Sequence, residues 1–190
     1  MKLILGSKSP RRAEILKMAG YDFEIIVSNV DEEVDETDPE KKVLEIAKKK
    51  ARSLKVNDGI ILCADTIVLT KENEILGKPK NKDDARRMIE LISDDYHYVY
   101  TAYVIIDCYN NKEFANLEKT KVNIVKLNHQ EIEEYINTDE PYDKAGAYAI
   151  QGKFGKFISS IEGDYYNVMG LPICAINQIL KKIEKLKNVL

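Results

Sequence analysis

The sequence has no run of apolar residues approaching the roughly 18 that a membrane-spanning helix needs. Its first residues also lack the extended apolar segment of a secretion signal. The three cysteines lie inside apolar runs, without the paired spacing of a zinc site, and their odd number favours free thiols over disulfides. We therefore expect a cytoplasmic protein that does not associate with membranes.

Neither sign of charge dominates, because 29 lysines and arginines stand against 32 aspartates and glutamates, giving a net charge of −3. A nucleic-acid-binding surface needs a broad excess of positive charge, so nucleic acid is not an expected partner. Any functional group of cations has to be local. With 190 residues, 44% of them hydrophobic, and no low-complexity linker, the chain is expected to form a single domain over residues 1–190.

The segment 3–12 combines a short apolar strand with the start of a helix. Gly6 permits a tight turn after the strand, and Ser9 followed by proline is typical of a helix N-cap. Donor and cationic side chains gather at this helix start: Ser7, Lys8, Ser9, Arg11 and Arg12. Adjacent arginines oppose the helix dipole unless an anion relieves them, so we interpret the segment as a phosphate site.

A second helix is predicted from Thr37 to about Lys55, because Thr37-Asp-Pro-Glu has capping-box spacing. Lys50 falls on the apolar face of this helix, so its ammonium group either extends back to water or faces a ligand. An acidic stretch precedes the helix. Its Glu32 closely follows a strand predicted over residues 23–27 and so lies near a strand end.

Residues 59–66 contain five apolar residues followed by Asp65 and Thr66. Such a run predicts a buried strand that presents polar groups at its C-terminal end, where open α/β sheets bind ligands. Gly77 would permit a ligand to approach Lys78, although one lysine is a weak indication by itself. His97, at the start of a later strand, is expected to make a structural hydrogen bond and not to bind metal.

The segment 143–152, DKAGAYAIQG, has small residues, two glycines and little from which to build a core. These features predict a loop packed closely against a ligand. Gln151 can donate and accept hydrogen bonds, which suits the edge of a nucleobase. Before this loop, two β-rich runs over 97–108 and 113–127 meet at an Asn-Asn turn, so part of the sheet is predicted to be antiparallel.

Together these segments indicate a triphosphate bound with a divalent metal. Phosphates need donors and cations, and hard cations such as Mg²⁺ take carboxylate oxygens. The sequence lacks GxxxxGK[ST], which excludes a P-loop NTPase.

Five blocks, in order and spanning nearly the whole chain, resemble the signature blocks of the Maf family of nucleoside triphosphate pyrophosphatases. They are SKSPRR (7–12), ADT (64–66), GKP (77–79), DKAGAYAIQG (143–152) and GDYYNVMGLP (163–172). The resemblance implies an elongated, two-lobed α/β protein with a mixed sheet, flanking helices and a central cleft, related to inosine triphosphate pyrophosphatases. It also implies metal-dependent hydrolysis, with Mg²⁺ or Mn²⁺, of a nucleoside triphosphate to the monophosphate and pyrophosphate. A homodimer is compatible with it.

The resemblance further implies a role for each matching residue. Asp65 would be the catalytic acid or base and, with Glu32, would hold the metal. The phosphate-side cations would be Arg11, Arg12, Lys50 and Lys78. Ser7 and Ser9 would donate hydrogen bonds, and Lys144 would also contact the substrate.

The loop form DKAGAYAIQG is similar to that of the subgroup acting on dTTP and UTP, which makes Arg11, Thr66 and Gln151 the specificity positions. Lys8 and Ala149 depart from the usual family residues beside this pocket. Two alternatives therefore stay open: the same reaction on another, modified or methylated nucleotide, and a nucleotide-binding regulator of cell division.

Overall fold

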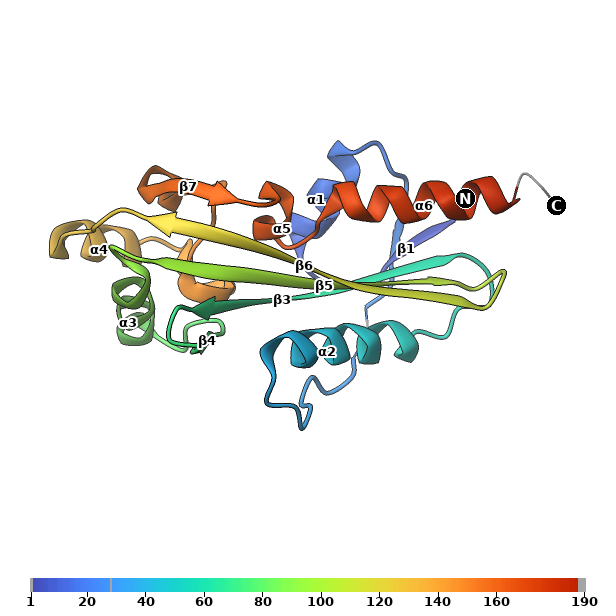
Figure 1. The fold of residues 1–190 in the computed structure, drawn as a ribbon, viewed down its shortest axis with the longest axis horizontal. Helices are drawn as coiled ribbons and strands as arrows, with labels where there is room; N and C mark the ends of the chain where they lie inside the picture. Colours follow the sequence, from blue (N-terminus) through green and yellow to red (C-terminus); the bar gives the residue numbers. More distant parts are fainter. Residues whose placement is uncertain (1, 28, 188–190) are drawn as a thin grey trace. The chain divides into compact units, whose positions relative to one another are not determined.

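The computed structural model describes residues 2–27 and 29–187 and has an α/β fold built on one mixed sheet (Figure 1). Within this described part the sheet has seven strands: β1 (Leu3–Leu5), β2 (Glu24–Ile25), β3 (Ile60–Thr70), β4 (Ile75–Leu76), β5 (Tyr96–Asp107), β6 (Lys112–Ile124) and β7 (Ile158–Glu162). Their order is β2-β1-β3-β5-β6-β7, with β4 added on β3. β1 is parallel to β2 and β3, whereas β4 is antiparallel to β3 and β7 to β6. The predicted mixed α/β sheet is confirmed.

The helices are α1 (Pro10–Met18), α2 (Pro39–Ser53), α3 (Lys82–Ile92), α4 (His129–Ile136), α5 (Tyr165–Met169) and α6 (Ile173–Lys187), with 3₁₀ helices η1 (Pro141–Asp143), η2 (Ala145–Ala147) and η3 (Lys153–Phe157). The N-cap of α2 is Asp38, whose side chain accepts hydrogen bonds from two first-turn amides. The predicted capping box beginning at Thr37 is therefore wrong, because Pro39 sets the start of the helix one residue later. None of the helices in the described residues combines the length and apolar character needed to cross a bilayer.

The chain divides into two compact units. Unit 1 comprises Met1–Asp65, Thr101–Glu118 and Gly170–Leu190, and unit 2 comprises Thr66–Tyr100 and Lys119–Met169. Strands β3, β5 and β6 each contribute residues to both units. The single domain over residues 1–190 and the central cleft stay predictions.

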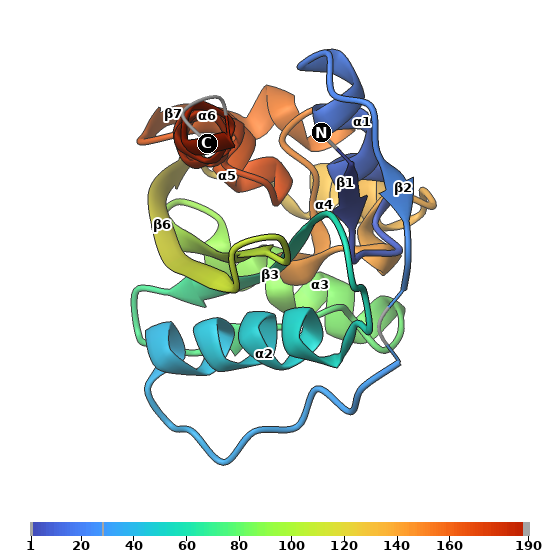
Figure 2. The same ribbon diagram turned by 90° about the vertical axis from the view of Figure 1, so that its right-hand side faces the viewer.

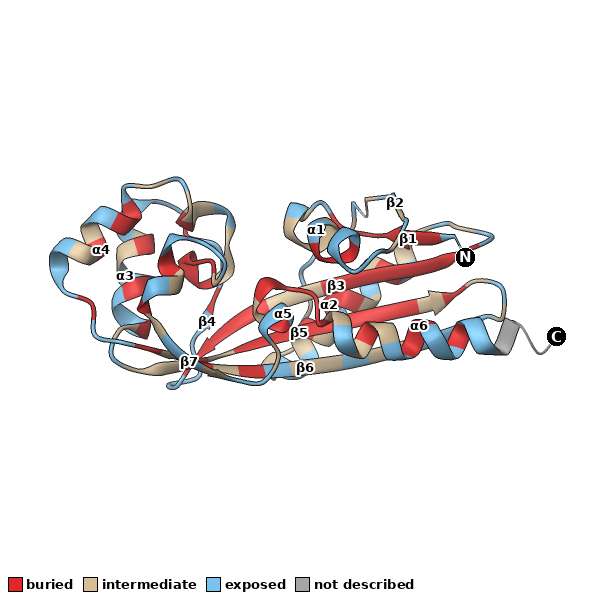
Figure 3. Ribbon diagram, turned by 90° about the horizontal axis from the view of Figure 1, so that it is seen from above, coloured by how far each residue is buried: buried red, intermediate tan, exposed pale blue. Residues whose placement is uncertain are grey.

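In unit 1, α2 lies on one face of the sheet, and α1 and α6 lie on the other (Figures 1 and 2). The apolar run at the start of β3 is buried, as Figure 3 shows for most of β3 and β5. β1 and β3 run close together where Gly6 N donates to Leu62 O at 2.8 Å. A Cβ at Gly6 would overlap Cys63 Sγ and lie 2.9 Å from Leu54 Cδ1, so any larger residue there would displace both side chains.

In unit 2, α3, α4 and the 3₁₀ helices pack on one face of the sheet. Their shared core includes Val68 of β3, Val99 of β5, Tyr148 and Phe154. The 143–152 segment thus contributes more to a core than its composition predicts, because its aromatic residue turns inward. His97 Nε2 lies 2.7 Å from the Tyr148 hydroxyl, which confirms the expected structural hydrogen bond. Burial lowers the pKa of His97 to about 3.

Candidate active site

The turn between β1 and α1 is ordered by Ser7. This serine is buried, and its Oγ accepts hydrogen bonds from Ser9 N at 3.2 Å and from Arg12 Nη1 at 3.1 Å. Ser9 is the N-cap of α1, as predicted, but its side chain makes no capping hydrogen bond. Ser7 therefore does part of the ordering that the sequence pattern assigns to Ser9, and its hydroxyl is held between a backbone amide and a guanidinium.

Arg12 ties three segments of unit 1 together. Besides Ser7, its Nη1 donates to Ala64 O at 2.8 Å, and its Nε donates to Gly170 O at 2.9 Å. Burial lowers the pKa of Arg12, and the nearby Asp65 carboxylate opposes that shift. The conflict between this cation and the helix dipole is thus relieved in part by carbonyl oxygens and a carboxylate of the protein itself. Arg11, its neighbour in the first turn of α1, is partly buried.

Unit 1 holds an ammonium group between two carboxylates. Lys50 Nζ lies 2.7 Å from Asp65 Oδ1 and 3.0 Å from Glu32 Oε1. The side chains of Lys50 and Asp65 are only 13% and 14% exposed, whereas that of Glu32 is 60% exposed. Helical periodicity on α2 correctly places Lys50 on the inner face, next to buried Ala51. Its ammonium is engaged by carboxylates and does not extend into water.

Asp65 lies in the middle of β3 and not at its end, where the sequence pattern predicts it. β3 does not end there: it continues through Thr70, and Asp65 and Thr66 are its two partly exposed residues. The pairing of β1 with β3 ends at Leu5 opposite Leu62, where β1 turns away at Gly6. Asp65 and Thr66 are therefore partly exposed because the short β1 ends before it reaches them. The expectation of a carboxylate at the C-terminal end of β3 itself is wrong.

The other residues predicted for the site belong to unit 2. Thr66 is partly buried on β3, while Lys78 and Gln151 are exposed. Gly146 N donates to Gly77 O at 3.1 Å, so the backbone next to Lys78 contacts the loop that ends at Gln151. Gly146 has a φ of +70°, and a Cβ there would crowd the side chain of β3 Val68.

Lys144 is engaged within its own loop. Its ammonium donates to Glu140 O at 2.8 Å and pairs with the Asp143 carboxylate. These contacts give Lys144 a part in holding the loop, whatever it does for a ligand.

The carboxylates of unit 1 fit a divalent cation that is completed by a substrate. No group of three or more His, Cys, Asp or Glu side chains in the described residues is placed to hold a metal ion. Asp65 and Glu32 nevertheless direct oxygens to one point, the Lys50 ammonium. Mg²⁺ is commonly bound by one or two carboxylates together with waters and phosphate oxygens, and this donor set suits such a site.

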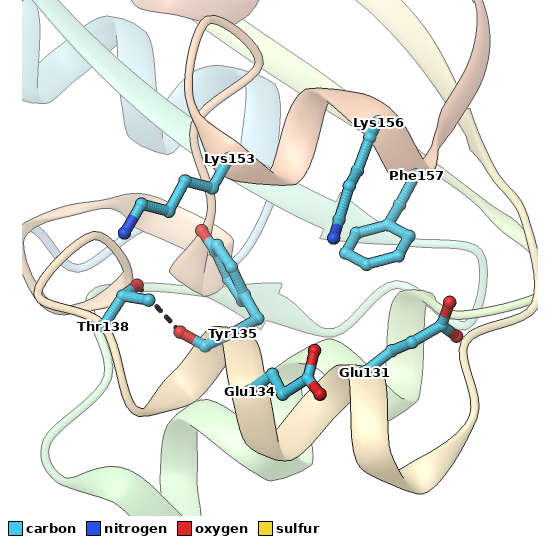
Figure 4. Close-up of a pocket in the computed structure, with 7 residues that line it drawn as sticks. All are labelled: Glu131, Glu134, Tyr135, Thr138, Lys153, Lys156 and Phe157. Carbon is cyan, nitrogen blue, oxygen red and sulfur yellow. Dashed lines mark hydrogen bonds between the residues drawn. The ribbon is translucent and has the colours of Figure 1, made fainter.

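A cavity of about 180 Å³ lies in unit 2, between α4 and η3 (Figure 4). Its lining is Glu131, Glu134, Tyr135, Thr138, Lys153, Lys156 and Phe157. None of these residues is among those predicted for the site.

Two further residues have parts that the sequence interpretation missed. The carbonyl of Gly170 receives Arg12, and the carboxylate of Glu140 receives two backbone amides of η3. Gly170 lies in the family-like block 163–172, which is a signal for its importance though not for its role. Glu140 precedes a proline and carries no recognisable sequence signal.

Comparisons with known proteins agree with the motifs. The family of Maf-like proteins matches residues 2–183. A dTTP/UTP pyrophosphatase of Thermoanaerobacter sp. (strain X514) is 46% identical over 185 residues, which is 96% of each chain. A dTTP/UTP pyrophosphatase of Alkaliphilus metalliredigens (strain QYMF) is 47% identical over 185 residues, 95% of each. The structure of the Staphylococcus aureus Ham1 protein aligns with a TM-score of 0.48 and 11% identity, covering 83% of this chain and 91% of that one.

Proposed function

This chain belongs to the Maf-like protein family, and we propose that it is a nucleoside triphosphate pyrophosphatase acting on dTTP and UTP. The products would be the nucleoside monophosphate and pyrophosphate. The names of relatives sharing 46–47% of its residues over nearly full length support this assignment. The observation that carries it is the pairing of Lys50 with Asp65 and Glu32 beside the turn that starts α1.

The reaction needs charge stabilisation and an oriented water, and unit 1 supplies groups for both. Cations at the start of α1, with Arg11 foremost, bind phosphate oxygens, and the hydroxyls of Ser7 and Ser9 add donors. Lys50 holds the Asp65 carboxylate in one orientation. Asp65 then accepts a proton from the attacking water, and Lys50 offsets charge that develops on the phosphates.

The bonds that change follow from this arrangement. The water oxygen bonds to the α phosphorus, and the bond from that phosphorus to the oxygen bridging to the β phosphate breaks. Pyrophosphate leaves with the electron pair. Arg12 and Ser7 keep the turn at α1 in place during the step, because their hydrogen bonds join β1, α1 and β3.

We also propose that the activity depends on Mg²⁺ or Mn²⁺. Glu32 and Asp65 would hold the ion together with phosphate oxygens, and the ion would neutralise phosphate charge and polarise a bound water.

Four residues of unit 2 complete the proposal. Lys78 serves as a further phosphate-side cation, and Thr66 and Gln151 with Arg11 select the base. Lys144 contributes by holding the loop through Glu140 O and Asp143, which is the role its contacts support best.

The test is a product assay in ¹⁸O-labelled water. The purified chain with Mg²⁺ is offered dTTP, UTP, the other common nucleotides and methylated ones, and we expect the label in the monophosphate of dTTP and UTP. Lys50→Met should reduce turnover at least about a hundredfold. Its matched control is Lys49→Met on the same helix, because Lys49 is exposed and its ammonium donates to a backbone carbonyl, Glu33 O. Label in the pyrophosphate, or no turnover of any nucleotide, would contradict the proposal.

The setting of the enzyme is proposed as the cytoplasm, because Cys63, Cys108 and Cys174 are free thiols. A homodimer stays a prediction. Light scattering on the purified chain measures it directly.

A further inference from the structure

The Glu140 carboxylate joins η3 to α4 in unit 2. Its Oε2 accepts a hydrogen bond from Lys153 N at 2.8 Å, and its Oε1 accepts from Phe154 N at 3.2 Å and from the Tyr135 hydroxyl at 3.0 Å. Burial, together with this carboxylate, raises the pKa of Tyr135, so its hydroxyl stays protonated as a donor. Figure 4 shows Tyr135 rising from α4 toward the segment that carries Lys153. One side chain thus fixes the first backbone amides of η3.

The turn immediately before η3 is packed tightly on Glu140. It spans residues 149–152, is closed by Gly152 N donating to Ala149 O at 3.2 Å, and contains Gln151. A Cβ at Gly152 would overlap the Glu140 carboxylate, and one at Gly155 would lie 2.6 Å from Ile150 O. The backbone of this turn therefore has close neighbours on both sides, while the Gln151 side chain is exposed.

Glu140 also holds the other end of the same loop. Its backbone carbonyl accepts a hydrogen bond from Lys144 Nζ at 2.8 Å, and the same ammonium pairs with Asp143. Both ends of the loop 143–152 are therefore held by hydrogen bonds to Glu140. Its path between these points is supported by Tyr148, whose hydroxyl contacts buried His97.

We propose that Glu140 is a positioning residue for nucleobase selection, which it controls by fixing the turn that carries Gln151. This inference rests on the proposed function and deepens it. A thymine or uracil edge presents a carbonyl acceptor beside an N–H donor, whereas cytosine presents an amino donor beside a ring-nitrogen acceptor. A glutamine amide matches either edge, but in opposite orientations. A turn held in one position lets the amide favour one orientation, and so one base.

The experiment compares kcat/KM for dTTP with kcat/KM for dCTP. Glu140→Gln replaces one acceptor oxygen by a donor facing a backbone amide, so we expect the dTTP:dCTP ratio to fall about tenfold. Tyr135→Phe removes the hydroxyl's hydrogen bond to Glu140 and its hydrogen bond with the Ala149 backbone, but it leaves both amide contacts of Glu140, so it should lower the ratio about threefold in a folded protein. The matched control is Glu134→Gln on α4, whose carboxylate bonds Gln130 and not the loop.

A double-mutant cycle separates positioning from a general loss of structure. Gln151→Ala should lower the ratio by itself, and adding Glu140→Gln should lower it no further, because both changes act through one side chain. Additive effects, or equal losses with dTTP and dCTP at an unchanged ratio, would refute the inference.

Amide hydrogen exchange tests the positioning role of Glu140 without measuring turnover. Exchange of the Lys153 and Phe154 amides should accelerate in Glu140→Gln, and unchanged exchange would also refute the positioning role. An unaltered chain that turns over no nucleotide would instead overturn the proposed function, and the selection role would fall with it.

Discussion

Replacing Asp65 by asparagine separates catalysis from stability in this fold. In the unaltered protein Lys50 Nζ lies 2.7 Å from Asp65 Oδ1. The asparagine amide has the same size, and its oxygen can still accept a hydrogen bond from Lys50. Lys50 also keeps its second partner, Glu32, at 3.0 Å. An ion pair is thus exchanged for a hydrogen bond from the ammonium to a neutral oxygen, which costs about 1 kcal/mol of unfolding free energy. For a chain of this size that lowers Tm by about 2–4 °C.

The effect on turnover should be much larger. An amide cannot take a proton from water, and general-base catalysis contributes about 10² to 10⁴ in rate, so we expect kcat/KM for dTTP to fall by that factor. Lys50→Met should destabilise the fold more than Asp65→Asn does. It leaves Asp65 and Glu32 without their shared ammonium, and because Asp65 is largely buried the cost is about 3 kcal/mol.

The assay is pyrophosphate release from dTTP, measured beside urea unfolding of each variant. Asp58→Asn, an exposed aspartate just before β3, is the control for a change of charge without a change in the site. An Asp65→Asn protein that retains more than about a tenth of the original kcat/KM would refute the role of Asp65 as proton acceptor. A loss of activity that merely follows a loss of folded protein would do the same.

Three other outcomes are expected. Gly6→Ala should cost about 1–3 kcal/mol in urea unfolding because its Cβ overlaps Cys63 Sγ, and adding Cys63→Ala should recover part of that loss. The unfolded chain binds a proton at His97 below pH 6.5, whereas the folded protein does so only near pH 3. The free energy of unfolding should therefore fall by about 2 kcal/mol as the pH is lowered from 7 to 5. His97→Gln should make the free energy of unfolding depend less on pH over this range. Chelation with EDTA should abolish pyrophosphate release, excess Mg²⁺ should restore it, and Glu32→Gln should raise the Mg²⁺ concentration needed; full activity in EDTA would exclude the metal.

Local patterns in the sequence predict part of the site well. Lys50 could be placed because the 3.6-residue period of α2 puts it on the face with buried Ala47 and Ala51. The strand carrying Asp65 could be recognised from its apolar run. The edge that exposes Asp65 could not, because it depends on where a different strand, β1, stops pairing.

Long-range partners were beyond any local pattern. Arg12 donates to a carbonyl 158 positions later, and a backbone carbonyl has no side-chain identity by which to recognise it. The small residues around Tyr148 predict a loop with little core, but one of them, Gly146, lets the backbone approach Val68 closely, and the Tyr148 ring is buried in the same core. The roles of Lys78, Thr66 and Gln151 toward a substrate stay predictions.

The hydrogen bond from Arg12 to Gly170 can form only after nearly the whole chain has been synthesised. β1 and α1 leave the ribosome first, but the carbonyl that receives the Arg12 guanidinium follows 158 residues later, about 8 to 30 seconds at ordinary translation rates. A nascent chain therefore contains the whole N-terminal motif for several seconds before Arg12 can bind the Gly170 carbonyl. A fragment truncated ahead of Gly170 would contain the N-terminal motif but would lack the partner of the Arg12 Nε group, so the shape of the turn at the start of the chain depends in part on residues made near its end.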